Sequence, residues 1–130
     1  VLSGEGSMIF STMPPALSHT KAGRLRALAV TTPKRVAAAP DVSTMIEAGV
    51  PGFESVLWNG ILVSAKTPRE IIDKINSDMR RILQLPDVKE RFAAQGGEIN
   101  PSTPEQLAAH LKSEIEKWGK VVRVSGARID

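Results

Sequence analysis

Apolar residues recur every three or four positions along two long stretches of the chain, residues 71–83 and 107–122. Each stretch follows a threonine and a proline, Thr67-Pro68 and Thr103-Pro104, and has a glutamate or glutamine three positions after the threonine. This arrangement is a capping box, in which the hydroxyl and the longer side chain satisfy free N–H groups at a helix start. The pattern therefore predicts two amphipathic helices.

The ends of these helices are marked as clearly as their starts. Pro86 cannot continue the backbone hydrogen bonding of the first helix, and Gly126 can close the second. Between the two lies a shorter apolar pattern over residues 87–95, which stops at Gly96-Gly97. We expect a third helix there.

Short apolar runs dominate the N-terminal half. Residues 7–10, 24–30 and 56–63 are predicted strands, and residues 98–100 form a fourth, brief one. A short helix is expected over residues 13–22, because hydroxyl residues and then two prolines precede it and Gly23 can end it. Thr44 and Glu47 match a capping box that covers little more than one turn before Gly49. Alternation of short strands and helices predicts an α/β chain.

Composition and charge narrow the classes of function. The chain has 130 residues, 42% of them hydrophobic, and no apolar run approaches the roughly 18 residues that span a bilayer. The net charge is +3, with the basic residues scattered among acids, so we interpret them as solvated helix faces and not as a phosphate-binding patch. With three Phe, two Trp and no Tyr, little is available for stacking bases. We expect no nucleic-acid partner.

No residue set supports catalysis or metal binding. The absence of cysteine excludes disulfides, thiol chemistry and cysteine-based metal sites. His19 and His110 lie on different predicted helices, and neither has a carboxylate or second histidine at metal-ligand spacing. Most acids lie on polar helix faces, and no nucleophile, zinc or phosphate-loop motif is present. The sequence predicts no enzyme activity, no metal and no cofactor.

The turn at Ser11 and Thr12 is the best candidate for binding chemistry. It joins a predicted strand to a predicted helix, so free backbone N–H groups and the positive end of the helix dipole meet there. Such a point can hold a carboxylate. The alternative is an ordinary N-cap that serves only its own helix, and the sequence leaves both open.

Several ordered motifs resemble one family of proteins over nearly all 130 residues. Residues 21–30, KAGRLRALAV, resemble the family's "AGKLRALAV", and PDVST at 40–44 with EAG at 47–49 resembles its "PDVPT..EAG". GFE at 52–54 with Trp58 and Gly60 is similar to its "GFE…W.G". The later helical starts, Pro86 and the segment 114–119 also fit. The chain is identified as a member of the tripartite tricarboxylate transporter substrate-binding proteins, also called Bug receptors.

The resemblance implies a type II periplasmic-binding fold with two α/β domains around a cleft. Residues 1–57 would be part of the second, ligand-binding domain. Residues 58–130 would be the return crossover and the C-terminal part of the first domain. It further implies a periplasmic, non-enzymatic receptor that binds a small carboxylate or an amino acid and delivers it to membrane transporter subunits.

Four residues are candidates for the ligand site. Ser11 and Thr12 come first, because the family holds ligand carboxylates with hydroxyls and backbone amides. Met13 comes next by its position in the turn. By family position, Trp58 lies near the return crossover, where it either lines the cleft or packs as core. We expect Trp118 to be core.

The start of the chain suggests a second interpretation. Val1 is neither Met nor part of a leader, so we expect these residues to be the C-terminal portion of a longer protein. The alternative is a truncated receptor-like domain that acts in self-association or partner interaction without ligand transport. A half-receptor would expose the surface that its missing domain covers, which favours a homo-oligomer.

Overall fold

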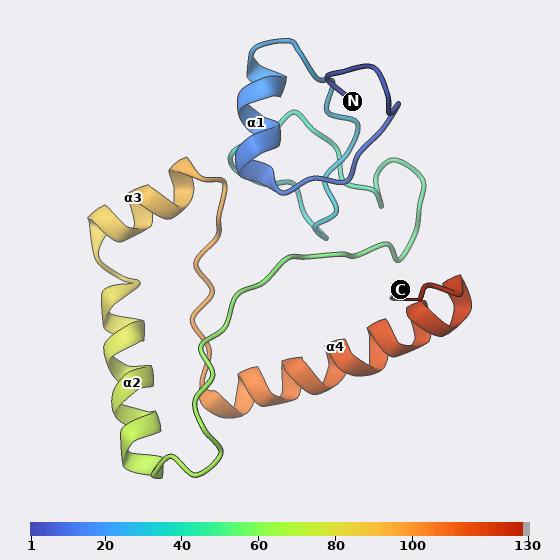
Figure 1. Cartoon of the computed structure of the whole chain (residues 1–130). Coiled ribbons are helices and arrows are strands. Elements are labelled where there is room, and N and C mark those ends of the chain that lie inside the picture. The colour runs from blue at the N-terminus through green and yellow to red at the C-terminus, as the bar shows by residue number, and fades with distance from the viewer. Residues whose placement is uncertain (129–130) are drawn as a thin grey trace. The chain divides into compact units, whose positions relative to one another are not determined.

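The computed structural model describes residues 1–128, and this part of the chain contains four helices (Figure 1). They are α1 (Met13–Lys21), α2 (Arg69–Ile82), α3 (Pro86–Ala94) and α4 (Pro104–Ser125). All four lie where the apolar spacing and the start signals predict a helix. The predictions of these helices are therefore confirmed, with bounds that shift by a few residues.

The predicted strands do not form a sheet among residues 1–128. Their backbone is irregular there, apart from one isolated parallel bridge between Val30 and Thr44. In that bridge the Val30 N–H donates to the Ser43 carbonyl at 2.9 Å, and the Met45 N–H donates to the Val30 carbonyl at 2.9 Å. A strand needs a neighbour to pair its N–H and C=O groups, and the described residues bring no second run alongside the predicted ones.

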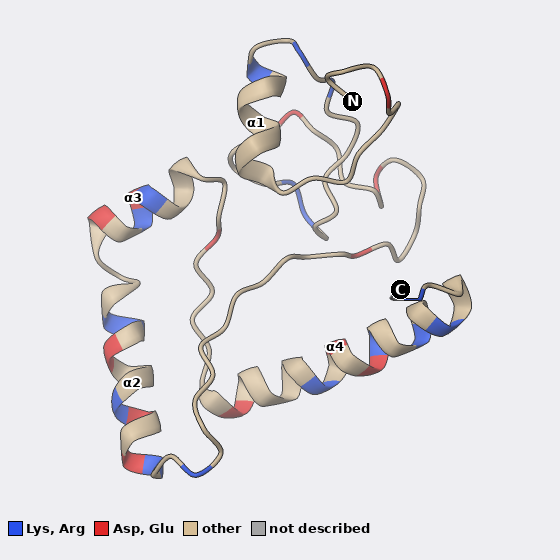
Figure 2. Ribbon diagram, in the orientation of Figure 1, with Lys and Arg blue, Asp and Glu red and all other residues tan. Residues whose placement is uncertain are grey.

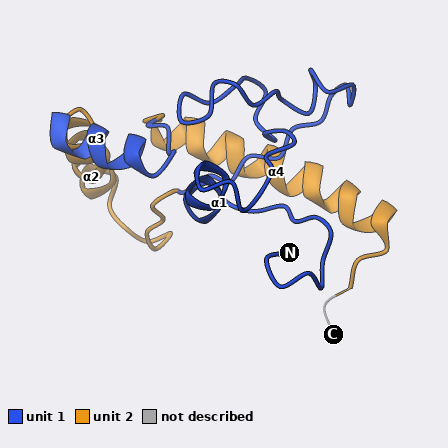
Figure 3. Cartoon of the chain, turned by 90° about the horizontal axis from the view of Figure 1, so that it is seen from above, with its two compact units in different colours: residues 1–59, 86–99 blue, residues 60–85, 100–130 orange. Residues whose placement is uncertain are grey.

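The chain divides into two compact units (Figure 3). The first unit comprises Val1–Asn59 and Pro86–Ile99, and so contains α1 and α3. The second begins with Gly60–Leu85, resumes at Asn100, and contains α2 and α4. The assignment of residues 1–57 and 58–130 to two receptor domains stays a prediction.

The first unit contains a capping turn that is built on the buried residue Thr44. Thr44 is only 2% exposed, and its N–H donates to Glu47 Oε2 at 2.8 Å while the Glu47 N–H donates to Thr44 Oγ1 at 3.1 Å. The predicted capping box is thus confirmed, although it closes a single turn and no helix follows. Arg35 pairs with Glu47 at 2.9 Å. The pKa of Glu47 is lowered below its usual value. The largest cause is the hydrogen bond from the Thr44 N–H, and the next is the hydrogen bond from Arg35.

Helices α2 and α4 pack against each other in the second unit. Asn76 Nδ2 donates to the Ser102 carbonyl at 2.8 Å, and Arg69 pairs with Glu105 at 2.6 Å. The apolar stripe predicted for α2 and α4 is half-buried at these positions: Ile72, Ile75, Met79, Leu107 and Leu111. Lys, Arg, Asp and Glu are interspersed along the helices, as expected of solvated faces (Figure 2).

The two predicted helix starts of this unit differ. At α4 the Thr103 hydroxyl accepts from the Gln106 N–H at 3.2 Å and the Gln106 side chain accepts from the Thr103 N–H at 2.9 Å, so that capping box is confirmed. At α2 the prediction is wrong. The N-cap there is Pro68, with no side-chain cap hydrogen bond, because the Thr67 N–H donates to the Ser64 carbonyl in a preceding turn and the helix begins one residue later.

Apolar side chains remain largely uncovered. Val36 is the buried hydrophobic residue in the described part of the chain, at 7% exposure. Leu57, Leu62 and Val124 are 74%, 72% and 90% exposed, and Trp118, which we expected to be core, is 39% exposed. The described residues therefore cover little of their own apolar surface.

Candidate functional site

The N-terminal end of α1 places three of the predicted site residues in succession. Ser11 and Thr12 are exposed, and Met13 is the first residue of the helix. Thr12 is the N-cap, with φ −67° and ψ 153°. The Ser11 hydroxyl donates to the Thr12 carbonyl at 3.2 Å. The strand-to-helix turn predicted from the sequence thus exists as a helix start, although the segment before it is not paired as a strand.

The Thr12 hydroxyl makes no capping hydrogen bond to its own helix. The cause lies in Pro14 and Pro15, which occupy the second and third helical positions. An N-cap side chain accepts from the N–H of one of those two positions, and proline has none. Thr12 is the N-cap by position, but its hydroxyl does not cap its own helix.

The same two prolines define the donors at this end. The first amides of a helix have no intrahelical acceptor. Because two of them are proline nitrogens, the remaining N–H groups in the first turn are those of Thr12 and Met13. These two amides and the Thr12 hydroxyl are donors that an anion could meet at this end, and the Ser11 hydroxyl would join them by leaving the Thr12 carbonyl.

The charges around α1 leave its positive end uncompensated from within the helix. No acidic residue lies in the first turn, and His19 and Lys21 lie in the last turn. The helix macrodipole stabilises negative charge near the N-terminus. A carboxylate at Thr12 would thus meet a favourable field and no neighbouring acid on α1.

Met13 packs against the end of α3. It is half-buried, and a β-carbon built on Gly96 would lie 2.4 Å from Met13 Cγ and 3.6 Å from Ala38 Cβ. The side chain of Met13 is thus directed to Gly96. Its role as a cleft residue stays a prediction.

Trp58 is half-buried in the irregular segment that precedes Gly60. A separate aromatic pair joins the segment before α1 to residue 53. The rings of Phe10 and Phe53 stack with centroids 6.5 Å apart. The sequence gives little indication of this pair beyond two aromatic residues in a chain that has few. Whether Trp58 lines a cleft stays a prediction.

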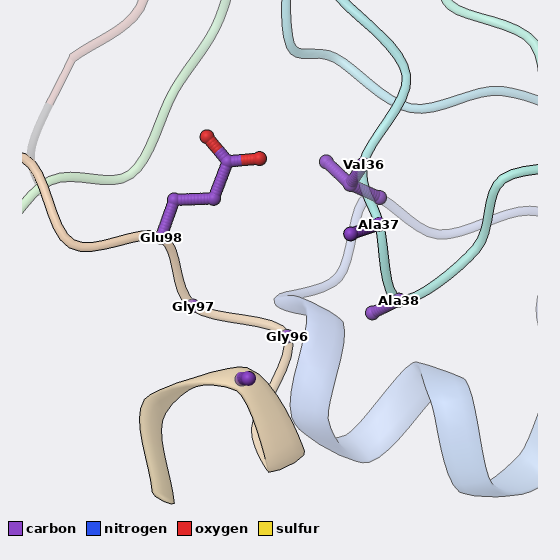
Figure 4. A pocket seen from close by; sticks show the side chains of 7 residues that line it. Val36, Ala37, Ala38, Gly96, Gly97 and Glu98 are labelled. Carbon is purple, nitrogen blue, oxygen red and sulfur yellow. The ribbon is translucent and has the colours of Figure 1, made fainter. Parts of the chain in front are cut away.

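A small cavity of about 180 Å³ lies beside α3 (Figure 4). Its lining residues are Val36, Ala37, Ala38, Ala93, Gly96, Gly97 and Glu98. The walls are alanine, glycine and valine, and the one charged side chain is that of Glu98, whose carboxylate would repel an anionic ligand. This cavity therefore fits a carboxylate less well than the start of α1 does. No sequence motif indicated the cavity. The described residues contain no group of three His, Cys, Asp or Glu that could hold a metal ion.

The sequence model of the tripartite tricarboxylate transporter family receptors (TctC) matches residues 1–127. "Protein BugT" of Bordetella pertussis is 36% identical over 99% of this chain and 40% of its own length. A UPF0065 protein in the tcbD-tcbE intergenic region of a Pseudomonas strain is 33% identical over 94% of this chain and 37% of its own.

Solved structures give the same result. R. palustris Rpa4515 with adipate superposes with a TM-score of 0.76 at 32% identity, over 88% of this chain and 38% of that one. Periplasmic binding protein BugD gives 0.74 at 33% identity, over 84% and 37%. A periplasmic transporter gives 0.85 at 29% identity, over 99% and 43%.

These neighbours confirm the predicted fold class, an α/β chain that forms part of a type II periplasmic-binding fold. The chain spans 40% and 37% of the length of the two curated relatives described above. In the described residues, no helix has the length and apolar content that a membrane crossing requires. The match over residues 1–127 shows that the chain belongs to the tripartite tricarboxylate transporter receptor family, the Bug proteins.

Proposed function

We propose that this chain contributes to a periplasmic receptor that captures a small carboxylate-containing metabolite for a tripartite tricarboxylate transporter. The observation that carries the proposal is the start of α1, where Thr12 caps no helical N–H and no acid lies in the first turn. A receptor needs donors that are in place before the ligand arrives, and this turn supplies them.

The ligand carboxylate would be held by hydroxyl and backbone groups. Charge-assisted hydrogen bonds from N–H and O–H donors to a carboxylate are about twice as strong as neutral ones. The hydroxyls of Ser11 and Thr12 and the N–H groups of Thr12 and Met13 would provide them, with Trp58 as an apolar wall. That a related R. palustris protein was solved with adipate supports a short carboxylic acid as the ligand class.

The role is binding and delivery without catalysis or cofactor. Membership in a transporter receptor family supports it, as do relatives described as periplasmic binding proteins. In this role the loaded receptor meets membrane subunits of the transporter in the periplasm. The alternative of a self-associating domain without transport is not favoured, because the matched family consists of receptors.

Titration calorimetry on the complete gene product tests the proposal, with adipate and other short mono- and dicarboxylates as ligands. The uncharged diamide of adipic acid serves as the matched control ligand. We expect at least one carboxylate to bind and the diamide not to bind. Replacing Ser11 and Thr12 together by alanine should weaken binding about a hundredfold or more, because each of the two lost hydrogen bonds to a charged group is worth roughly 1.5–3 kcal/mol.

Ser18→Ala is the matched control variant, since its hydroxyl lies on the same helix and donates to the Pro15 carbonyl at 3.2 Å. It should bind like the unaltered protein. Absence of binding to every carboxylate tested, or equal affinity for the diamide, would contradict the proposed function. Unchanged affinity in the Ser11 and Thr12 double variant would remove those residues from the site.

A further inference from the structure

Helix α3 ends in a Schellman motif centred on Gly96. The Gly97 N–H donates to the Phe92 carbonyl at 2.9 Å, and the Gly96 N–H donates to the Ala93 carbonyl at 2.9 Å. Gly96 itself has φ +71°, in the left-handed region. This pair of hydrogen bonds is the standard way in which glycine closes a helix.

Gly96 differs from the other left-handed glycines in what surrounds it. Gly23, Gly52 and Gly126 have φ of +69°, +73° and +67°, and a β-carbon on any of them would meet nothing within 4 Å. A β-carbon on Gly96 would lie 2.4 Å from Met13 Cγ and 3.2 Å from Met13 Cβ. Real side chains do not approach so closely, so Met13 rests on the bare backbone of Gly96.

We propose that Gly96 is a positioning residue for the carboxylate site, because it fixes the place of Met13 and thereby that of Thr12 and Ser11. This inference rests on the proposed function. It adds that the end of α3 sets the geometry of the donors at the start of α1. Figure 4 shows Gly96, with Ala38 beside it, next to the start of that helix.

The helical side of Met13 is stiff, which leaves the side of Thr12 and Ser11 to yield. Met13 is followed by Pro14 and Pro15, whose rings lock φ near −65°. A displacement of Met13 is therefore not absorbed by the first turn and passes to Thr12, the adjoining N-cap. Hydrogen bonds to a carboxylate depend on placement within about half an ångström. A methyl group at position 96 would push Met13 away from α3 by more than that.

The test measures the affinity of the complete gene product for adipate, or for whichever carboxylate binds most tightly in the titration proposed above. Gly96→Ala should weaken binding about tenfold or more through displaced donors. Gly126→Ala has the same conformational strain at another helix end without a neighbour, and should bind normally. Adding Met13→Ala to Gly96→Ala removes Met13 Cγ, the atom in closest conflict, and should restore most of the affinity.

The outcomes separate a positioning role from a structural one. If Gly96→Ala lowers the melting temperature but leaves affinity unchanged, or if Met13→Ala does not restore the lost affinity, the inference is wrong. Should Gly96→Ala fail to fold, Met13→Ala alone loosens the same contact, and unchanged affinity in that variant overturns the inference as well. A protein that binds no carboxylate, or a Ser11 and Thr12 variant that binds normally, would instead contradict the proposed function.

Discussion

Replacing Thr44 by valine is expected to lower the free energy of unfolding by about 1–2 kcal/mol. Valine keeps the shape of threonine but removes the hydroxyl that accepts from the Glu47 N–H at 3.1 Å. Thr44 is 2% exposed, so the methyl group of valine would fill the place of the hydroxyl and hinder water from replacing the lost acceptor. The loss therefore includes both the capping hydrogen bond and the cost of leaving a donor without a partner.

Urea denaturation, followed by circular dichroism, measures this effect on the complete gene product. Thr67→Val is the matched control, because the Thr67 side chain precedes a helix in the same way but makes no capping hydrogen bond. It should change the free energy of unfolding by less than about 0.5 kcal/mol. Equal losses in the two variants would mean that the Thr44 hydroxyl contributes nothing beyond its volume.

Replacing Thr12 by aspartate should weaken adipate binding about a hundredfold or more. Two unit charges about 4 Å apart near a protein surface repel by roughly 4 kcal/mol before salt screens them. The new carboxylate would occupy the place proposed for the ligand's own. Calorimetric titration at low and at physiological ionic strength would show the loss and its partial recovery with salt.

The same substitution should not destabilise the fold, and this separates the two effects. Pro14 and Pro15 offer an aspartate at this position no N–H to cap, but its negative charge interacts well with the positive end of the helix dipole. Thr12→Asn is the control that keeps a similar size without the charge, and it should bind far better than Thr12→Asp. If Asp and Asn bind alike, no ligand carboxylate lies at Thr12.

Local signals account for what could be predicted of the fold. Helices α1, α3 and α4 were predictable because proline, threonine and glycine mark their ends within a few residues of sequence. The same signals misplaced the start of α2, since a turn closed by the Ser64 carbonyl uses the Thr67 N–H first. Competition between adjacent turns is decided by geometry that a motif does not contain.

The strands were not predictable in the same way, because pairing is a property of two segments. Residues 24–30 have the composition of a strand, yet Val30 alone forms a bridge, and it does so with Thr44. The aliphatic side chains of the segment 56–63 are exposed for the same reason. Composition identifies a segment able to pair, while the partner is determined by the rest of the fold.

The candidate site was half predictable. Ser11 and Thr12 could be selected because they precede a helix, and the loss of two donors to Pro14 and Pro15 follows from the sequence as well. The contact between Met13 and Gly96 could not be predicted, because it joins residues far apart in the chain through tertiary packing. Nothing in the spacing of either residue indicated it.

The proposed receptor function depends on a carboxylate that binds at the N-terminal end of α1. The most direct test is a titration of the complete, isotope-labelled gene product with adipate, followed by nuclear magnetic resonance of the backbone amides. We predict that the signals of Thr12 and Met13 move most and saturate with the calorimetric affinity, because their N–H groups donate to the ligand. Saturable binding that leaves both signals in place, while the signals of amides elsewhere move, would contradict carboxylate binding at this helix end.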